Sequence, residues 1–253
     1  MNGKKSAESG ELLDLALIRA AHYRFLAEAF RYPAPGARER LRAYMPAAET
    51  MPLTEDSAVA AMDGVRRWLD GADDAALESA WIDAFGHTLP EAYPPLETRY
   101  GSTHAFQESQ DLADVTAFYD AFGLRPKPGR GERADHVGVE LDFVYFLALQ
   151  EAYALEKSDA EGAERSRATS RSFLEDHLAR WGPVFGSLLA RKGTHPLYRD
   201  LGTLLVAILR ADIVGLGLSP RPVSPEPVPL PPEPTPEDVE ALETAALERG
   251  ELP

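Results

Sequence analysis

Two acidic residues and a histidine stand close together in the middle of the sequence, in the run ADHVGVELDF (134–143). Asp135 and His136 are adjacent, and Glu140 follows His136 by four residues, which makes them neighbours on one helical face. Such side chains can ligate a metal ion, but one helical turn supplies too few ligands and no second cluster supplies the rest. We therefore expect Asp135 to cap a helix, His136 and Glu140 to form a polar pair on its surface, and no metal site.

A second segment of interest is WIDAFGHTLPEAYPPLETRYG (81–101), which ends one predicted helix and continues as a proline-rich loop. Trp81, Phe85 and Tyr100 offer flat apolar surface, and Trp and Tyr also carry a polar group. Glu97 stands beside them in the LETRY stretch. The residues alone leave two interpretations open: the aromatic side chains pack the loop onto the core, or they line a binding surface.

The rest of the chain carries no strong catalytic signature. There is no Gly-rich phosphate loop, no nucleophile elbow and no paired-histidine zinc motif, and the six histidines are scattered. With no cysteine, disulfides, thiolate metal sites and cysteine nucleophiles are excluded. We predict a protein that is not an enzyme and has no cofactor of its own.

The elements that must position these residues are helices. Apolar residues recur at three- and four-residue spacing nearly throughout. This spacing predicts helices at about 11–31, 37–44, 55–70, 74–85, 109–122, 135–157, 161–181, 184–191 and 196–214, with Asp73 as an N-cap. Proline and glycine predict loops at 86–101 and 123–133. The helix from Asp135 is the most hydrophobic long one and should be central. The fold class is therefore all-α, a single globular bundle of helices over residues 11–218.

The two ends have a different composition. Residues 1–10 are polar and are expected to be flexible. Residues 219–236 contain nine prolines, which predicts an extended tail over 219–253 with a short acidic helix at 236–249.

Charge and hydropathy limit the partners and the compartment. The net charge of −15 argues against nucleic acid, and suits solubility or a basic partner segment. The first eleven residues lack the apolar stretch of a signal peptide. The most apolar run, 201–209, is far shorter than the roughly 20 residues of a membrane span. We expect a cytoplasmic protein without a membrane anchor.

The two segments together resemble the TorD/NarJ-type chaperones of molybdenum-cofactor reductases, and most closely the branch that serves respiratory type II members of the dimethyl-sulfoxide-reductase family. FGHT followed by PPLETRYG, the helix LADVTAFYDAFGL and then ADHVGVELDF agree with the family in order and spacing over roughly residues 11–217. The family often has an aromatic residue at Leu96 and a proline at Ala134, and this chain departs from it at both positions.

The resemblance implies an all-helical fold and a specific role. Such proteins bind the apo catalytic subunit, often through its N-terminal twin-arginine leader, until molybdopterin guanine dinucleotide is inserted. A leader has a basic front and an apolar stretch, so its binder should offer an apolar groove edged with carboxylates. By the match to the motifs, the wall candidates are Trp81, Phe85 and Tyr100. The rim candidates are Glu97, Asp135 and Glu140, with His136 beside them.

Two alternatives stay open. The chain could be a permanent structural subunit of the reductase complex, or a helical metal-dependent hydrolase that uses His136 and Glu140. The sequence leaves the client's substrate undetermined, and it is compatible with a monomer or with a dimer that exchanges helices about 123–133.

Overall fold

The computed structural model describes residues 2–48, 55–86, 89–101, 105–125 and 132–229. Its elements follow one another along the chain as α1 (Asn2–Phe30), α2 (Ala37–Ala48), α3 (Asp56–Gly71), α4 (Asp74–Phe85), α5 (Thr98–Gly101), α6 (Ala105–Ala121), α7 (Val137–Glu156), α8 (Ala160–Phe173), the π-helical turn η1 (Leu174–Leu178), α9 (Ala179–Lys192) and α10 (Pro196–Leu216). The described part of the chain contains no β-strand, so the predicted all-α fold is confirmed.

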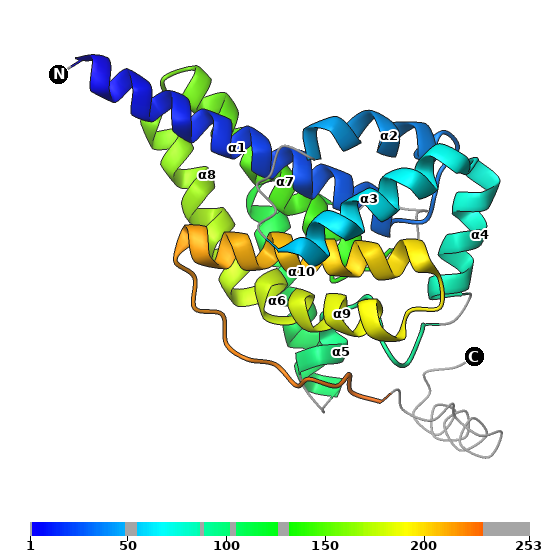
Figure 1. The fold of residues 1–253 in the computed structure, drawn as a ribbon. Coiled ribbons are helices and arrows are strands. Elements are labelled where there is room, and N and C mark those ends of the chain that lie inside the picture. The colour runs from blue at the N-terminus through cyan, green and yellow to red at the C-terminus, as the bar shows by residue number, and fades with distance from the viewer. Residues whose placement is uncertain (1, 49–54, 87–88, 102–104, 126–131, 230–253) are drawn as a thin grey trace, which may run out of the picture.

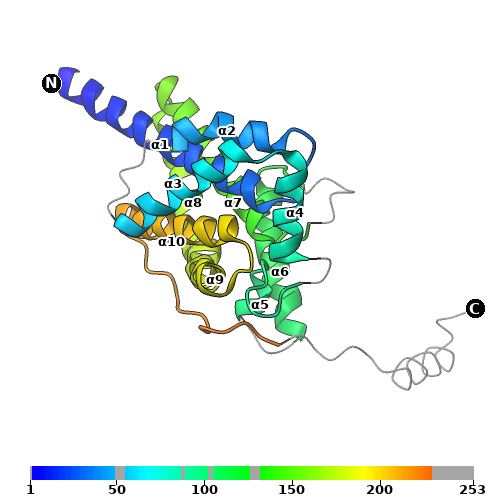
Figure 2. The same cartoon turned by 45° about the vertical axis from the view of Figure 1, so that its right-hand side comes forward.

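The helices form a bundle in which the contacts of α1 with α7 and of α9 with α10 are the most extensive. Helix α1 packs mainly on α7, and α7 packs in turn on α8, while α9 and α10 lie against each other on the other side. Helix α3 lies along α10 and α2 along α1, as Figures 1 and 2 show from two directions. The N-terminal end of α1 projects from the body of the bundle beside α8.

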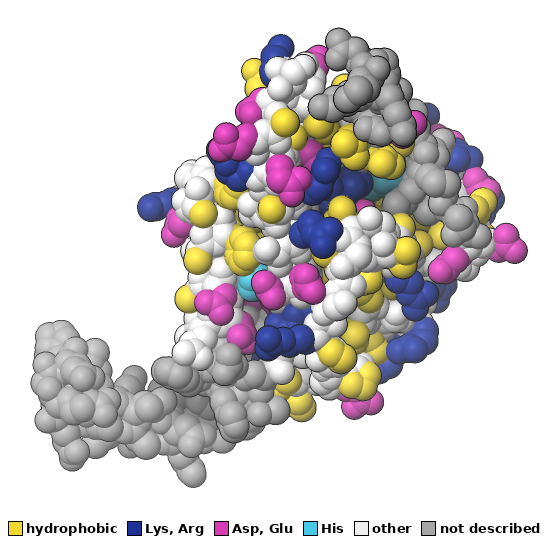
Figure 3. Space-filling model, turned by 90° about the vertical axis from the view of Figure 1, so that its left-hand side faces the viewer, with side chains coloured by type: hydrophobic (Ala, Val, Ile, Leu, Met, Phe, Trp, Pro, Cys, Tyr) yellow, Lys and Arg dark blue, Asp and Glu magenta, His cyan; other side chains and the backbone are white. Residues whose placement is uncertain are grey.

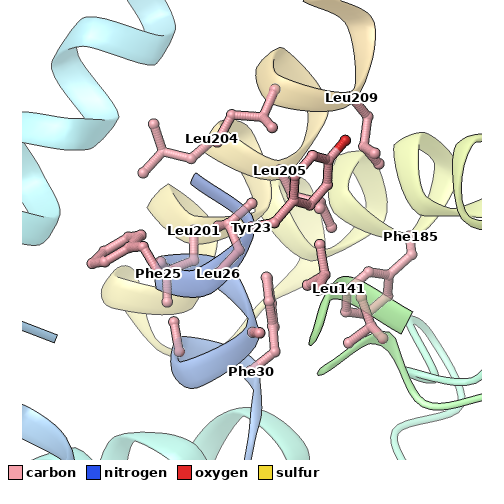
Figure 4. Packing of buried hydrophobic residues seen from close by; sticks show 14 of the residues in the cluster. Tyr23, Phe25, Leu26, Phe30, Leu141, Phe185, Leu201, Leu204, Leu205 and Leu209 are labelled. Atoms are coloured by element: carbon pink, nitrogen blue, oxygen red, sulfur yellow. The ribbon is translucent and has the colours of Figure 1, made fainter. Parts of the chain in front are cut away.

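The core is continuous and is filled from helices that are distant in sequence. Figure 4 shows side chains of α1 meeting those of α7, α9 and α10, among them Phe30, Leu141, Phe185 and Leu205. Helix α7 is buried on more than one face, because Leu141, Phe143, Val144 and Leu147 are all enclosed. Its predicted central position is confirmed.

Local signals place most helix ends well. Helix α4 spans the predicted residues, and Asp73 caps it by accepting a hydrogen bond from the Ala76 N–H at 2.8 Å. Helix α1 begins earlier than predicted, at Asn2 instead of about residue 11.

The predicted break between 181 and 184 is wrong. The chain stays helical from Ala160 to Lys192, with Pro183 inside α9. Proline removes one backbone donor and crowds the carbonyl four residues before it, which here belongs to Ala179. Ala179 directly follows the wide turn η1, so the irregularity of the backbone is concentrated over these two turns and the helix continues.

Helix α10 ends at a glycine that redirects the chain. Gly217 has φ +63°, and the Leu218 N–H donates to the Ile213 carbonyl at 2.9 Å, a common helix terminus. Residues 219–229 then follow in extended form, as predicted for this part of the tail; residues 230–253, with the predicted short helix, lie outside the described residues. Within the described helices, none combines the length and the hydropathy needed to cross a bilayer.

Candidate functional site

The two sequence motifs lie against each other although about 35 residues separate them. Leu96 and His136 form an isolated antiparallel β-bridge. The Glu97 N–H donates to the Asp135 carbonyl at 3.0 Å, and the Val137 N–H donates to the Pro95 carbonyl at 2.9 Å. The loop before α5 is thereby fixed to the start of α7, which brings Glu97, Tyr100, Asp135, His136 and Glu140 into one region.

Asp135 joins the two motifs and does not cap the helix. Its buried carboxylate accepts from the Thr98 hydroxyl at 2.7 Å and from the Arg133 Nε–H at 3.0 Å. The N-cap is His136 instead, whose Nδ1 accepts from the Gly138 N–H at 3.1 Å. The expected Asp135 cap is therefore wrong by one residue. Burial lowers the pKa of His136 to about 4, so its ring is neutral near pH 7 and Nδ1 stays free to accept.

Glu140 is fully buried, so the expected surface pair with His136 is also wrong. Its carboxyl accepts from the Trp181 Nε1–H at 3.1 Å, a contact between α7 and α9. Burial, with the nearby charge of Glu97, raises the pKa of Glu140 well above that of an ordinary glutamate. Glu140 is therefore a hydrogen-bonded carboxyl inside the core that resists ionisation.

Glu97 lies between this interior and the surface. Both of its carboxylate oxygens lie 3.1 Å from Nδ1 of His177, in the turn η1. Burial raises the pKa of Glu97, and the hydrogen bond from His177 opposes that rise. Glu97, Asp135 and Glu140 are 7%, 0% and 0% exposed, so they do not form the exposed acidic rim that the motifs suggested.

The predicted aromatic wall is divided between two places in the core. Tyr100 is fully buried and stacks on Trp181, with ring centroids 5.4 Å apart. Phe85 packs edge-on against Tyr198 at 5.0 Å, next to Trp81 at 5.3 Å. Trp81 is only half-buried and donates its Nε1–H to the Phe30 carbonyl. The three rings therefore do not meet in one wall in this structure, and Phe85 and Tyr100 serve packing.

The surface beside Glu97 holds a cleft that the motifs did not reveal. It has a volume of about 570 Å³ and lies between α6, η1 and the start of α9. We call it the acidic cleft; its carboxylates belong to Glu97, Asp111, Asp114 and Asp176, its apolar part to Ala117, Phe118 and Ala121, and its other polar groups to His177, Arg180 and Arg221. Four carboxylates stand against two guanidinium groups, so the cleft carries an excess of acidic groups beside its apolar part.

The sequence held a weak signal for this cleft. Asp111, Asp114 and Phe118 recur at three- and four-residue spacing on one face of α6, but such a face is also typical of a solvated helix. On the face in Figure 3, acidic and basic side chains lie next to one another over the described surface.

No group of three or more histidine, aspartate or glutamate side chains stands in a metal-binding arrangement among the residues that the structure describes. His136 uses its Nδ1 in the helix cap and Glu140 uses an oxygen on Trp181. The geometry that a hydrolase would need around these two residues is therefore not assembled by the described side chains.

The sequence was also compared with those of known proteins. The chain is 34% identical over 106 residues to the selenate reductase assembly chaperone protein of Thauera selenatis, an alignment over 42% of this chain and 53% of the relative. It is 33% identical over 110 residues to the chlorate reductase assembly chaperone protein of Ideonella dechloratans, over 44% and 55%. The chaperone protein TorD of Photobacterium profundum is 27% identical over 142 residues, over 55% and 64%.

The chain thus spans about half the length of the first two of these relatives. The family described as nitrate reductase delta subunit matches residues 54–187, which contain both motifs and the acidic cleft apart from Arg221. This match covers just over half of the chain. The chain therefore belongs to the nitrate reductase delta subunit family, the family of the TorD/NarJ-type proteins.

Proposed function

We propose that this protein is an assembly chaperone for the catalytic subunit of a molybdenum-containing oxidoreductase, and not an enzyme. It binds the subunit in its apo form in the cytoplasm and holds it until molybdopterin guanine dinucleotide has been inserted. Membership of the family and the names of the relatives, which are assembly chaperones of selenate and chlorate reductases, support this function.

The acidic cleft is the observation that carries the proposal. An N-terminal leader with paired arginines and an apolar stretch has the chemistry that the cleft complements. Asp111, Asp114 and Asp176 offer carboxylates to guanidinium groups, and carboxylate–arginine pairs are often bidentate, which adds geometric specificity. Phe118 and its alanine neighbours provide an apolar contact for the following residues.

The buried carboxylates have a supporting role in this proposal. Glu97 lines the cleft and is held in place by its hydrogen bond with His177. Asp135 holds the LETRY loop in place by accepting a hydrogen bond from Thr98. Reversing the charge of Asp135 would leave a buried ammonium beside Arg133 and would disturb the fold. The more accessible carboxylates of the cleft, the exposed Asp114 and Asp176 and the half-buried Asp111, are therefore the right positions to test.

The test is a triple variant, Asp111→Asn with Asp114→Asn and Asp176→Asn. Its affinity for a synthetic peptide with two adjacent arginines and an apolar run should fall by about threefold to a hundredfold at low salt, since exposed ion pairs contribute about 0.2–1 kcal/mol each. The control replaces Glu161 and Glu164 by glutamine, which removes two negative charges, where the triple variant removes three, from exposed positions of α8, away from the cleft. Equal affinity of the triple variant and the wild type would contradict the assignment.

A pull-down from the native cytoplasm separates the chaperone from a permanent subunit of the complex. The proposal expects one large molybdoenzyme subunit without its cofactor. Co-purification with the mature, cofactor-loaded enzyme would instead identify a structural subunit.

A further inference from the structure

The extended residues 219–229, which we call the strap, are held against the bundle at two separate points. At its start the Ser219 N–H donates to Oε1 of Glu175, a residue of η1, at 3.1 Å. Near its end the Val228 N–H donates to the Arg99 carbonyl at 2.7 Å, and the Arg99 guanidinium donates to the Val228 carbonyl. Figures 1 and 2 show the strap running from the end of α10 past α9 to α5. Its far anchor is thus a residue of the LETRY motif.

Between these anchors the strap borders the acidic cleft. Arg221, the single basic residue of the strap, lines the cleft together with Asp111, Asp114 and Asp176. Its side chain is exposed and closes no ion pair with the described residues, although it stands among carboxylates. The strap therefore presents to the cleft the same group, a guanidinium on an extended backbone, that a basic client segment would bring.

The far anchor also brings the strap against the loop before α5. Pro227, Val228 and Pro229 share a hollow of about 200 Å³ with Leu89, Pro90 and Pro94. Alternate prolines restrict the strap to extended conformations before it binds, which lowers the entropy lost on docking. Because the strap is covalently attached, it also meets the cleft at a high effective concentration.

From these contacts we propose that the strap is a built-in competitor of the client: Arg221 holds the position of a client arginine, and a client peptide must displace the strap to bind. This inference rests on the proposed function of the acidic cleft. It makes binding selective, because a segment with weak affinity for the cleft does not displace the strap. The strap is held by few hydrogen bonds, so a segment with paired arginines displaces it.

The first experiment weakens the far anchor in the full-length chain. Val228→Pro removes the N–H that donates to Arg99 and keeps an extended backbone, whereas the control Val228→Ala keeps that N–H. Loss of one hydrogen bond shifts the equilibrium between docked and free strap by about twofold to tenfold. The paired-arginine peptide should therefore bind Val228→Pro up to tenfold more tightly than the wild type, and Val228→Ala like the wild type.

A second variant tests the role of Arg221 directly. Arg221→Gln should also bind the peptide more tightly, because the competing guanidinium is gone. Weaker binding by Arg221→Gln would mean that this side chain helps to hold the client, and would overturn the competitor model.

Amide hydrogen exchange at Val228 reports the strap itself. The amide should be protected in the free protein and should lose protection when the peptide saturates the cleft. Peptide binding with unchanged protection, or equal affinity of Val228→Pro and the wild type, would overturn the strap inference and leave the cleft assignment standing. No binding by the wild type or any variant would overturn both.

Discussion

Replacing Glu140 by glutamine should stabilise the fold increasingly as the pH rises. In the folded chain Glu140 is enclosed in the core, and burial with the charge of Glu97 raises its pKa well above the ordinary value of 4.5. In the unfolded chain the carboxyl is solvated and ionises near that value. Glutamine has a similar shape, keeps an oxygen for the Trp181 Nε1–H, and cannot ionise.

The size of this stabilisation follows from the one proton that Glu140 binds in the folded state and releases in the unfolded state. Below pH 4.5 both states of the wild type are protonated at Glu140, so the pH has no effect through this group. Above pH 4.5 the unfolded state releases the proton and the folded state keeps it, so stability falls by about 1.4 kcal/mol per pH unit until the folded pKa is reached. The difference between the glutamine variant and the wild type should grow at this rate.

Urea unfolding at pH 5, 6 and 7 measures this difference. With a denaturant slope of about 3 kcal/mol per molar urea, the midpoint of the variant should move away from that of the wild type by roughly 0.5 M for each pH unit. The denaturant slope itself should not change, since the buried area is the same. Parallel midpoints across the three pH values would show that Glu140 is ionised in the folded chain, and would refute the neutral acid inferred from its burial.

Two further predictions concern the packing of α9 on α10 and the cap of α7. A Cβ at Gly202 would lie 2.7 Å from the Gly186 carbonyl oxygen, so Gly202→Ala should lower the free energy of unfolding by about 1–3 kcal/mol. Gly215 in the same helix has open space around it, so Gly215→Ala should raise the free energy of unfolding by about 0.5–1 kcal/mol. Urea unfolding of both variants tests the close approach of the two helices, and an equal effect of the two substitutions would contradict it. His136→Asn keeps a capping side chain but removes a group whose folded pKa is lowered to about 4. The wild type should therefore lose up to about 1.4 kcal/mol per pH unit from this group as the pH falls from 6.5 toward 4, and the variant should lack that loss; unchanged acid sensitivity in a urea titration would count against a neutral buried ring.

The fold was predictable from the sequence where the signals were local. Apolar spacing, proline and glycine positions and the Asp73 cap placed the helices of the bundle, because each depends on a few neighbouring residues. Pro183 misled the prediction because a proline usually ends a helix, and only the wide turn before it shows how this helix continues.

The candidate site was predictable only in part, for a physical reason. The motifs identified residues that meet in space, since Leu96 and His136 form a bridge. They did not reveal how deeply Asp135 and Glu140 are buried, because Thr98 and Trp181, which satisfy them, stand about 40 residues away in the sequence. A carboxylate in a helical pattern is normally exposed, so its burial depends on partners that periodicity does not show.

The opposite shifts of His136 and Glu140 mean that the pH dependence of the unfolding free energy of the wild type does not reveal either group by itself. Between about pH 4.5 and 6.5 the neutral His136 makes stability rise with pH, and the neutral Glu140 makes it fall. Each group changes the free energy of unfolding by up to about 1.4 kcal/mol per pH unit, and the two changes have opposite signs. The two contributions therefore largely cancel in that window. A flat stability curve there would result from two buried groups that both resist ionisation, and only the single variants separate them. Above pH 6.5 the contribution of His136 levels off, and the cost of keeping Glu140 protonated between the LETRY loop and α9 becomes visible.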